Sequence, residues 1–253
     1  MSLHNAMVKQ GHFLFRWRSY VPLLLAGPLL IALRESVVFE DIIFKPLDDL
    51  WAFFCFLLSL SGLLIRGMTV GFVPAGTSGR NTQGQRAEVL NTTGMYSIVR
   101  NPLYLGNFLI LLGLILSIKI WWLVLLVSMF FFIYMERIIM AEESFLHDKY
   151  GPEYDSWRNK TPVIIPDFKN WLAPSLPFSM KTVLRREYPG LLGMVTAFLG
   201  MEMIVDLVFR KQSFQTWIVD DYMWTVIFLI TLIFCLTLRH LKKNTDLLRV
   251  SGR

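Results

Sequence analysis

The chain has 253 residues, of which 54% are apolar and only 17% are charged, and its mean hydropathy is +0.49. Soluble domains lie nearer to about 45–50% apolar and about 25% charged residues. The composition therefore excludes a disordered chain, a fibrous protein and an ordinary soluble enzyme. It predicts an all-α, polytopic integral membrane protein, and the length favours a single membrane-embedded domain over residues 1–253.

Net charge and cysteine content exclude further classes. The formal charge of +6 could indicate nucleic-acid binding, but positive charge on the cytoplasmic side of a membrane protein explains it equally well. Cys55 and Cys235 both lie in apolar runs, so neither a disulfide framework nor a metal site is expected. The first apolar run, near Tyr20, lacks a small-residue cleavage pattern, so no cleavable signal peptide is expected.

Six apolar runs approach the length of about 20 residues that a spanning helix needs, some of them marginally. Only Lys119 and Ile120 separate the third run from the fourth, which predicts a tight antiparallel hairpin. The six runs cover residues 20–33, 50–65, 103–118, 121–135, 189–209 and 223–238.

The distribution of basic residues sets the predicted orientation. If the N-terminus is cytoplasmic, only five of the 25 Lys and Arg residues fall in outer segments: Arg34, Lys45, Lys119, Arg210 and Lys211. The outer loops are short and acidic. The positive-inside rule therefore predicts six helices with both termini in the cytoplasm, and a nucleic-acid partner is not needed. No retention signal is visible, which favours a bacterial inner membrane over the endoplasmic reticulum.

Polar chemistry concentrates in two long inner segments, residues 66–101 and 136–188. In the first, Gly, Ser and Thr residues precede Arg80 and Asn81, a composition that can wrap an anion with backbone N–H groups and a guanidinium. A flexible loop is the alternative. The segment is not a P-loop, because the Gly-Lys-Ser/Thr ending is missing.

The start of the third helix is a second candidate site. Pro102 suits the first helical turn and Asn101 its N-cap. Arg100 then stands at the membrane surface beside the positive end of a helix, where a carboxylate or phosphate would be attracted. Arginine and tyrosine at a helix mouth are also routine interface anchors, and Tyr104 fits that alternative.

The fourth helix is expected to continue as far as Gly151 and to carry Glu136, Arg137, Glu142 and Glu143. These carboxylates could pair with a cationic ligand, although from the residues alone a solvated, ion-paired face is favoured.

Two further places carry polar residues near or in the membrane. Trp157 and Arg158 suit a segment at the lipid headgroup level. Glu202 and Asp206 share a face of the fifth helix, where Asp206 is expected near the outer end in contact with water.

Two sequence motifs, which follow one another along the chain, together resemble one protein family. They read Gly94-x-Tyr96-x-x-Val-Arg100-Asn101-Pro102-x-Tyr104-x-Gly106 and Glu142-Glu143-x-x-Leu146-x-x-x-Tyr150-Gly151-x-Glu153-Tyr154-x-x-Trp157, followed by Pro162 and Pro166. Together they resemble the isoprenylcysteine carboxyl methyltransferase and phospholipid methyltransferase superfamily. The resemblance covers residues 94–166, the methyltransferase core, and leaves two additional C-terminal helices at 189–240 outside it.

The resemblance implies a membrane enzyme that uses S-adenosylmethionine without a Rossmann domain, with a cytoplasmic cofactor pocket and a lipid acceptor arriving from the bilayer. It implies no metal. The implied cofactor residues are Tyr96, Arg100, Asn101, Pro102, Tyr104, Gly106 and Glu142; the implied catalytic residues are Arg137, Glu142 and Glu143. Candidate acceptor contacts are Arg80, Asn81, Trp157 and Arg158. The oligomeric state is open.

This sequence departs from the family at Asn101, where histidine is usual. Asparagine can keep a hydrogen bond but cannot titrate near neutral pH. Arg137 matches a family arginine only loosely. The cytoplasmic excess of arginine favours an acceptor with a carboxylate or phosphate over an amine, which would first have to lose a proton.

Two other functions remain open at this point. Membrane sterol and steroid reductases that use NADPH share the Arg-x-Pro-x-Tyr-x-Gly and Lys-Tyr-Gly patterns, here Lys149, Tyr150 and Gly151. They usually carry an acidic-cysteine pattern before Lys-Tyr-Gly, which this chain lacks. A non-enzymatic transporter or scaffold would need polar groups deep in several helices, and only Glu202 and Asp206 qualify.

Overall fold

The computed structural model describes residues 3–74, 76–77, 87–220 and 222–252, and the regular structure over these residues is helical, without a strand. Five helices are long and apolar enough to cross a bilayer. They are α2 (Ala26–Ile42, after a 3-10 turn Val21–Leu25), α3 (Lys45–Phe72), α6 (Trp121–Tyr150), α8 (Met180–Met203, continued by a π-helical turn Ile204–Phe209) and α10 (Tyr222–Asn244). The predicted polytopic, all-helical class is confirmed.

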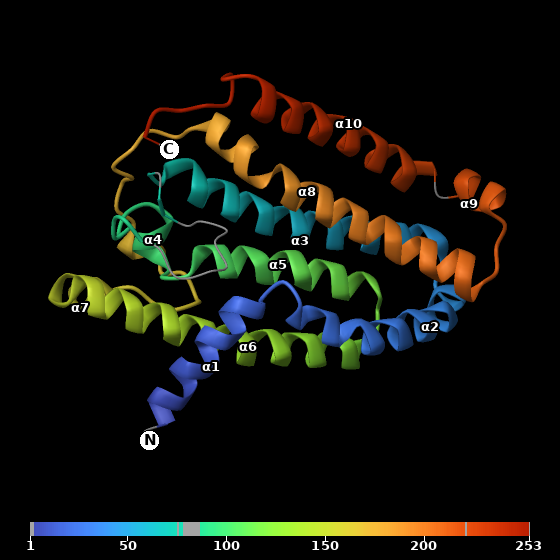
Figure 1. The fold of residues 1–253 in the computed structure, drawn as a ribbon. Helices are drawn as coiled ribbons and strands as arrows, with labels where there is room; N and C mark the ends of the chain where they lie inside the picture. Colours follow the sequence, from blue (N-terminus) through green and yellow to red (C-terminus); the bar gives the residue numbers. More distant parts are fainter. Residues whose placement is uncertain (1–2, 75, 78–86, 221, 253) are drawn as a thin grey trace.

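The third predicted span is shorter than expected. It forms α5 (Pro102–Ser117), an apolar helix of 16 residues. The predicted tight hairpin follows it, since α6 begins at Trp121 and Lys119 takes a positive φ of 65° in the turn. The two helices therefore run in opposite directions along each other (Figure 1).

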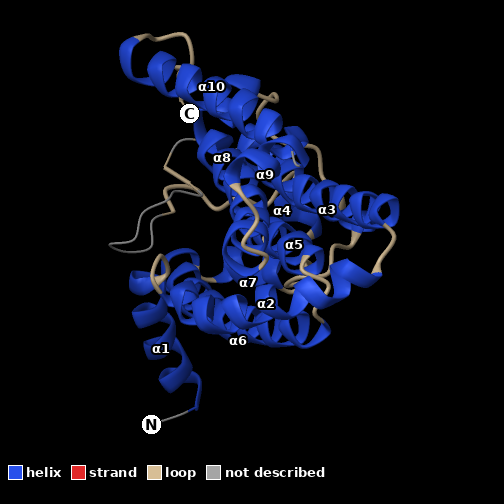
Figure 2. Cartoon of the chain, turned by 90° about the vertical axis from the view of Figure 1, so that its right-hand side faces the viewer, coloured by secondary structure: helices blue, strands red, loops and turns tan. Residues whose placement is uncertain are grey.

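The helices lie side by side in the order α10, α8, α3, α5, α6 and α1 (Leu3–Trp17) (Figure 1). One end of the bundle, here named the α7 end, carries the short helices α4 (Met95–Ile98) and α7 (Pro152–Arg158). The opposite end carries α9 (Phe214–Asp220) and is named the α9 end. Figure 2 views the bundle from that end.

Small residues bring α3 and α5 into backbone contact. A Cβ placed on Gly113 would lie 2.2 Å from the hydroxyl of Ser59, and one on Gly62 would lie 2.4 Å from the carbonyl oxygen of Gly106. The Ser59 hydroxyl also donates to the carbonyl of Ile110 at 2.9 Å. Within a bilayer, helices associate through such close packing and hydrogen bonds, because lipid removes the hydrophobic drive.

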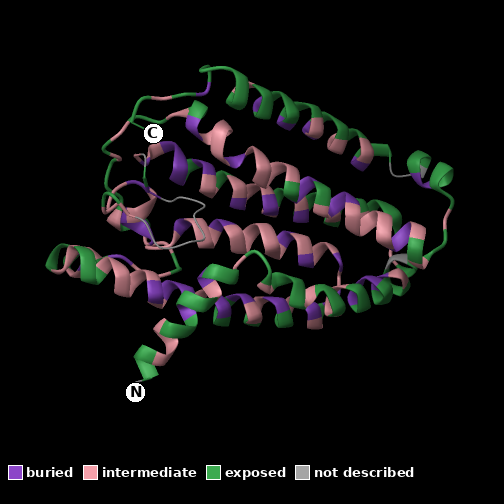
Figure 3. Cartoon of the chain, in the orientation of Figure 1, coloured by how far each residue is buried: buried purple, intermediate pink, exposed green. Residues whose placement is uncertain are grey.

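Large apolar side chains on the outer faces of the bundle are exposed (Figure 3). Phe54, Ile133 and Ile230 represent this surface on α3, α6 and α10. A soluble protein rarely exposes apolar area on this scale, so these faces are those that a bilayer would cover.

The fifth predicted helix begins nine residues earlier than expected. The Ser179 hydroxyl accepts from the Thr182 N–H at 3.3 Å and so caps α8, which places Pro189 inside the helix rather than at its start. Proline is tolerated within membrane helices because neighbouring groups satisfy the freed carbonyl. As a consequence, Glu187 lies on α8 instead of in a loop.

A buried ion pair joins three helices near the α7 end. Arg66 of α3 donates two hydrogen bonds to the carboxylate of Glu187 on α8, at 2.8 and 3.0 Å, and a third to Asn107 of α5 at 2.7 Å. Glu187 is only 5% exposed. Among the described residues these side chains compensate one another, so the cluster fixes how α8 lies against α3 and α5.

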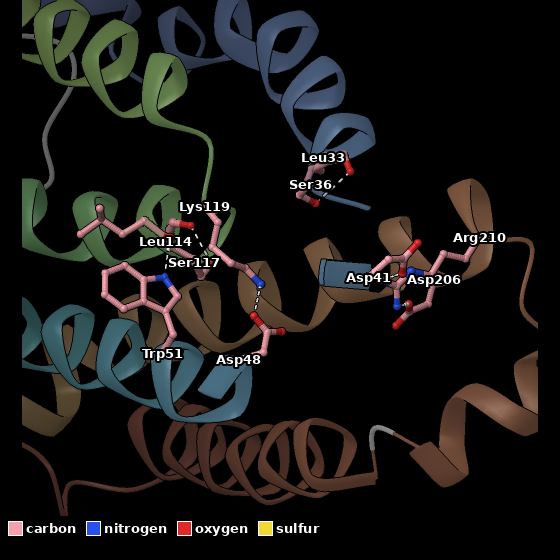
Figure 4. Close-up of polar contacts among 11 residues, drawn as sticks. Leu33, Ser36, Asp41, Asp48, Trp51, Leu114, Ser117, Lys119, Asp206 and Arg210 are labelled. Carbon is pink, nitrogen blue, oxygen red and sulfur yellow. Dashed lines mark hydrogen bonds and ion pairs between the residues drawn. The ribbon is translucent and has the colours of Figure 1, made fainter. Parts of the chain in front are cut away.

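Ion pairs also organise the α9 end (Figure 4). Lys119 of the hairpin turn contacts Asp48 of α3. Arg210 bridges Asp41 of α2, at 2.9 Å, and Asp206, at 3.3 Å. The expectation that Asp206 meets water is wrong: its side chain is buried and paired, because the π-helical turn directs it toward Arg210.

We expect Glu187→Ala to lower the free energy of unfolding by about 3–5 kcal/mol, because it leaves the Arg66 guanidinium buried without its counter-ion. The matched control is Asp246→Ala, which breaks the exposed Arg249–Asp246 pair and should cost less than about 1 kcal/mol. Unfolding in detergent, followed by circular dichroism, measures both. Equal effects of the two variants would contradict the role assigned to the cluster.

Candidate active site

The start of α5 is built by a compact turn and an interlocked loop. Gly94 takes a positive φ of 60° before the single turn of α4, and Pro102 occupies the first turn of α5 as predicted. Asn101 does not cap the helix through its side chain. Its Nδ2 instead donates to the carbonyl of Val163 at 3.1 Å, which ties the helix start to a distant part of the chain.

The segment after α7 is laid along residues 94–100 by backbone hydrogen bonds. The N–H of Arg100 donates to the carbonyl of Pro162 at 2.8 Å, that of Asp167 to Ile98 at 2.9 Å, and that of Gly94 to Leu172 at 2.9 Å. The Ser97 hydroxyl also accepts from the N–H of Leu172 at 2.9 Å. These bonds close residues 162–172 over the start of α5.

The two predicted motifs meet through adjacent carboxylates on α6. Arg100 donates to Glu143 at 2.7 Å, and the Tyr104 hydroxyl donates to Glu142 at 2.8 Å. The helix extends past the apolar part to Tyr150 and stops at Gly151, whose φ is +52°, as the sequence predicts. That extension is what carries both carboxylates to the α7 end.

Residues of α7 complete the surroundings of Glu143. Arg158 lies 3.8 Å from Glu143, with 47% of its side chain exposed. Tyr154 is fully buried beneath, and burial together with the negative charge of Glu143 raises the pKa of its phenol to about 12. The indole of Trp157 donates to the carbonyl of Tyr96 at 3.0 Å, so α7 is locked onto α4.

A hollow at the protein surface opens beside this cluster. Arg100 and Arg158 line it together with the backbone-held segment that includes Thr161, Pro162 and Asp167. The Nε of Arg100 is buried and has no hydrogen-bond partner within the described part of the chain. Two guanidinium groups, those of Arg100 and Arg158, therefore line the hollow, and the Nε of Arg100 lies beneath its surface.

Other predicted site residues lie elsewhere. A Cβ on Gly106 would approach Arg66 and the Gly62 carbonyl, so this glycine serves the α3–α5 contact. Arg137 pairs with its neighbour Glu136. Arg80 and Asn81 lie outside the described residues.

Arg18 is a residue that the sequence reading missed. It follows α1, places its guanidinium 4.5 Å from the ring centroid of Phe15, and interacts electrostatically with Glu142 and Tyr104. Phe15 in turn packs on Tyr134 and Ile138 of α6. The stretch before the first span is basic and amphipathic, which could have indicated this role. Such a stretch is also typical of a segment that only lies at the membrane interface.

Comparison with known proteins gives a clear match over the centre of the chain. Residues 53–153 match the phospholipid methyltransferase family. This span includes most of α3, all of α5 and α6, and both carboxylates. The match supports the family resemblance read from the motifs.

One curated relative is the nickel-cobalt-cadmium resistance protein NccN of Alcaligenes xylosoxydans xylosoxydans. It is 28% identical over 125 residues, which cover 49% of this chain and 56% of the relative, so the chain spans about half the length of the relative it matches. No solved structure matches the chain.

We expect Asn101→Asp to loosen residues 163–167, because the substitution removes the N–H donor to Val163 without changing side-chain size. Loss of one hydrogen bond costs about 1 kcal/mol, equivalent to about fivefold faster amide exchange. Hydrogen–deuterium exchange of the detergent-solubilised protein measures this. Asn159→Asp, at an exposed position beside the same hollow, should leave exchange unchanged; an equal effect would indicate a charge effect instead.

Proposed function

We propose that this protein transfers a methyl group from S-adenosylmethionine to the polar headgroup of a membrane lipid or lipidated acceptor. The observation that carries the proposal is the pairing of both residues of the Glu142–Glu143 motif with the start of α5, Glu142 with Tyr104 and Glu143 with Arg100. The family match supports methyl transfer as the reaction class. We propose in addition that the acceptor is a lipid and that the methyl donor is S-adenosylmethionine.

The chemistry of the donor set fits such a cofactor. S-adenosylmethionine supplies, when bound, an electrophilic methyl group on a positively charged sulfur, together with an amino and a carboxylate group. Glu142 and Glu143 would favour the positive charges, and the Arg100 guanidinium at the hollow would donate hydrogen bonds to the carboxylate. Tyr96, Asn101 and Pro102 would shape the wall, and Gly106 would let Arg66 support it from behind.

The acceptor would lie on the exposed side of the cluster. In-line methyl transfer depends mainly on holding the two reactants close together and excluding water. Arg158 is partly exposed and would orient an anionic headgroup, while Trp157 holds α7 in place. Arg137 pairs with its neighbour Glu136, one to two turns before the Glu142–Glu143 pair, and would act at most through the position of α6. An anionic carboxylate or phosphate is therefore favoured over an amine.

The same proposal sets the orientation of the protein. The α7 end would face the cytoplasm with both chain termini, most simply in a bacterial inner membrane. The basic residues concentrate at this end by the positive-inside rule. S-adenosylmethionine is then supplied from the aqueous side, and the lipid arrives from the bilayer.

We expect Arg100→Ala to weaken binding of S-adenosylmethionine about tenfold or more, because a charge-assisted hydrogen bond contributes about 1.5–3 kcal/mol. Isothermal titration calorimetry on the purified protein measures the affinity. Glu202→Gln, near the C-terminal end of α8 and away from the motifs, should bind normally. Unchanged affinity in Arg100→Ala, with its circular dichroism intact, would contradict the assigned pocket.

Label transfer tests the reaction itself. The detergent-solubilised protein is incubated with methyl-labelled S-adenosylmethionine and fractions of total membrane lipid, and labelled lipid is the expected product. Base lability and mass then separate ester, amine and phosphate products. Absence of labelled lipid from every fraction, together with binding of NADPH, would contradict the proposal and favour a reductase.

A further inference from the structure

Helix α1 is fixed to α6 along one face. A Cβ on Gly11 would lie 2.0 Å from the carbonyl oxygen of Arg137 and 2.8 Å from the Cβ of Ala141, so the two helices touch at the backbone. One turn later, Phe15 is buried against Tyr134 and Ile138. The contact lies on the part of α6 that leaves the apolar span, and the N-terminal half of α1 projects away from the bundle there (Figure 1).

The opposite face of α1 carries an exposed aromatic stripe. The stripe consists of Phe13 and Trp17, one turn apart on α1, and Tyr20 in the turn that follows the helix; they are 61%, 45% and 61% exposed. Their ring centroids lie 6.3 and 5.8 Å apart along the stripe. None of the residues that the structure describes covers this row of rings, and such a surface suits a partner that is apolar with a polar edge.

The charge beside the stripe has one sign. Lys9 and Arg16 are exposed on α1, Arg18 follows directly, and the sequence has no Asp or Glu before Glu35. An N-terminal segment with exposed rings and cations but no carboxylate of its own is complementary to an anionic partner.

The position of α1 in the chain indicates which partner this is. The first candidate span begins at Val21, immediately after Tyr20, so the aromatic stripe ends where the chain reaches the membrane. Tryptophan and tyrosine prefer this headgroup level, and amphipathic helices rich in Lys and Arg lie in it.

We propose that α1 is an interfacial helix that binds the surface of an anionic lipid bilayer through Phe13, Trp17 and Tyr20, with Lys9 and Arg16 contacting lipid phosphates. Because α1 is also fixed on α6 through Gly11 and Phe15, its place at the surface sets the position of Arg18, which interacts electrostatically with Glu142 and Tyr104. The helix thus links the lipid surface to the candidate active site. This inference does not depend on methyl transfer.

The test uses the full chain in lipid nanodiscs. A nitroxide spin label is placed at exposed position 12 by His12→Cys, with the buried Cys55 and Cys235 replaced by alanine. Its collision rates with oxygen, which concentrates in the bilayer, and with a water-soluble nickel reagent report depth. We expect the label to be deeper in discs of phosphatidylcholine mixed with phosphatidylglycerol than in phosphatidylcholine alone.

Charge variants make the test specific. Each basic residue near an anionic surface strengthens membrane binding by about 1 kcal/mol, or about fivefold. The double variant Lys9→Gln with Arg16→Gln should therefore lower the ratio of membrane-bound to unbound α1 by about 25-fold. The matched control, Lys181→Gln with Lys243→Gln, removes the same charge from exposed positions on α8 and α10 and should keep the lipid dependence.

Two results would overturn the proposal. One is a label equally open to the nickel reagent in both lipids and in both variants. The other is shielding that grows with the number of protein molecules per disc, which would assign the stripe to a second copy of the chain. Neither readout involves S-adenosylmethionine, so the outcome is independent of the proposed function.

Discussion

The arrangement of the candidate site depends on the turn between α5 and α6. With so few residues between the helices, and Lys119 in a left-handed conformation, the chain has no choice but to reverse. The start of α5 and the far part of α6 are thereby brought to the same end of the bundle. Side chains of a helix lean toward its N-terminus, so Tyr104 leans outward and Glu142 leans back to meet it.

That hairpin is held in the bundle from α3, at both ends. Near the turn, Lys119 reaches Asp48, and near the site, Arg66 binds Asn107 of α5 and Glu187 of α8. The family match ends at residue 153, yet Glu187 lies beyond it. The C-terminal helices are therefore joined to the family core through a buried charge, and removing them would leave Arg66 uncompensated.

The sequence predicted those features that follow from local chemistry. Apolar runs located the spans, Pro102 and Gly151 marked helix ends, and the two motifs singled out Arg100, Glu142 and Glu143, which the structure brings together with Tyr104. It did not predict contacts made across the fold. Asn101 looked like a helix cap but binds Val163, and Asp206 looked solvated but is buried against Arg210. In each case a contact with a group from another part of the fold replaces the interaction that the local sequence favours: a backbone carbonyl for Asn101, and a guanidinium for Asp206.

The adjacency of Glu142 and Glu143 has a consequence for chemistry. Neighbouring residues on an α-helix point about 100° apart, so the two carboxylates cannot share one partner set. Glu143 faces Arg100 and the half-exposed Arg158, whereas Glu142 faces the Tyr104 phenol and interacts electrostatically with Arg18. Glu143 is thus already balanced by two cations, and a cationic ligand would compete with both. Glu142 accepts from the Tyr104 hydroxyl and interacts with Arg18, which directly follows α1. Of the two, Glu142 is the carboxylate whose charge balance the N-terminal helix can change.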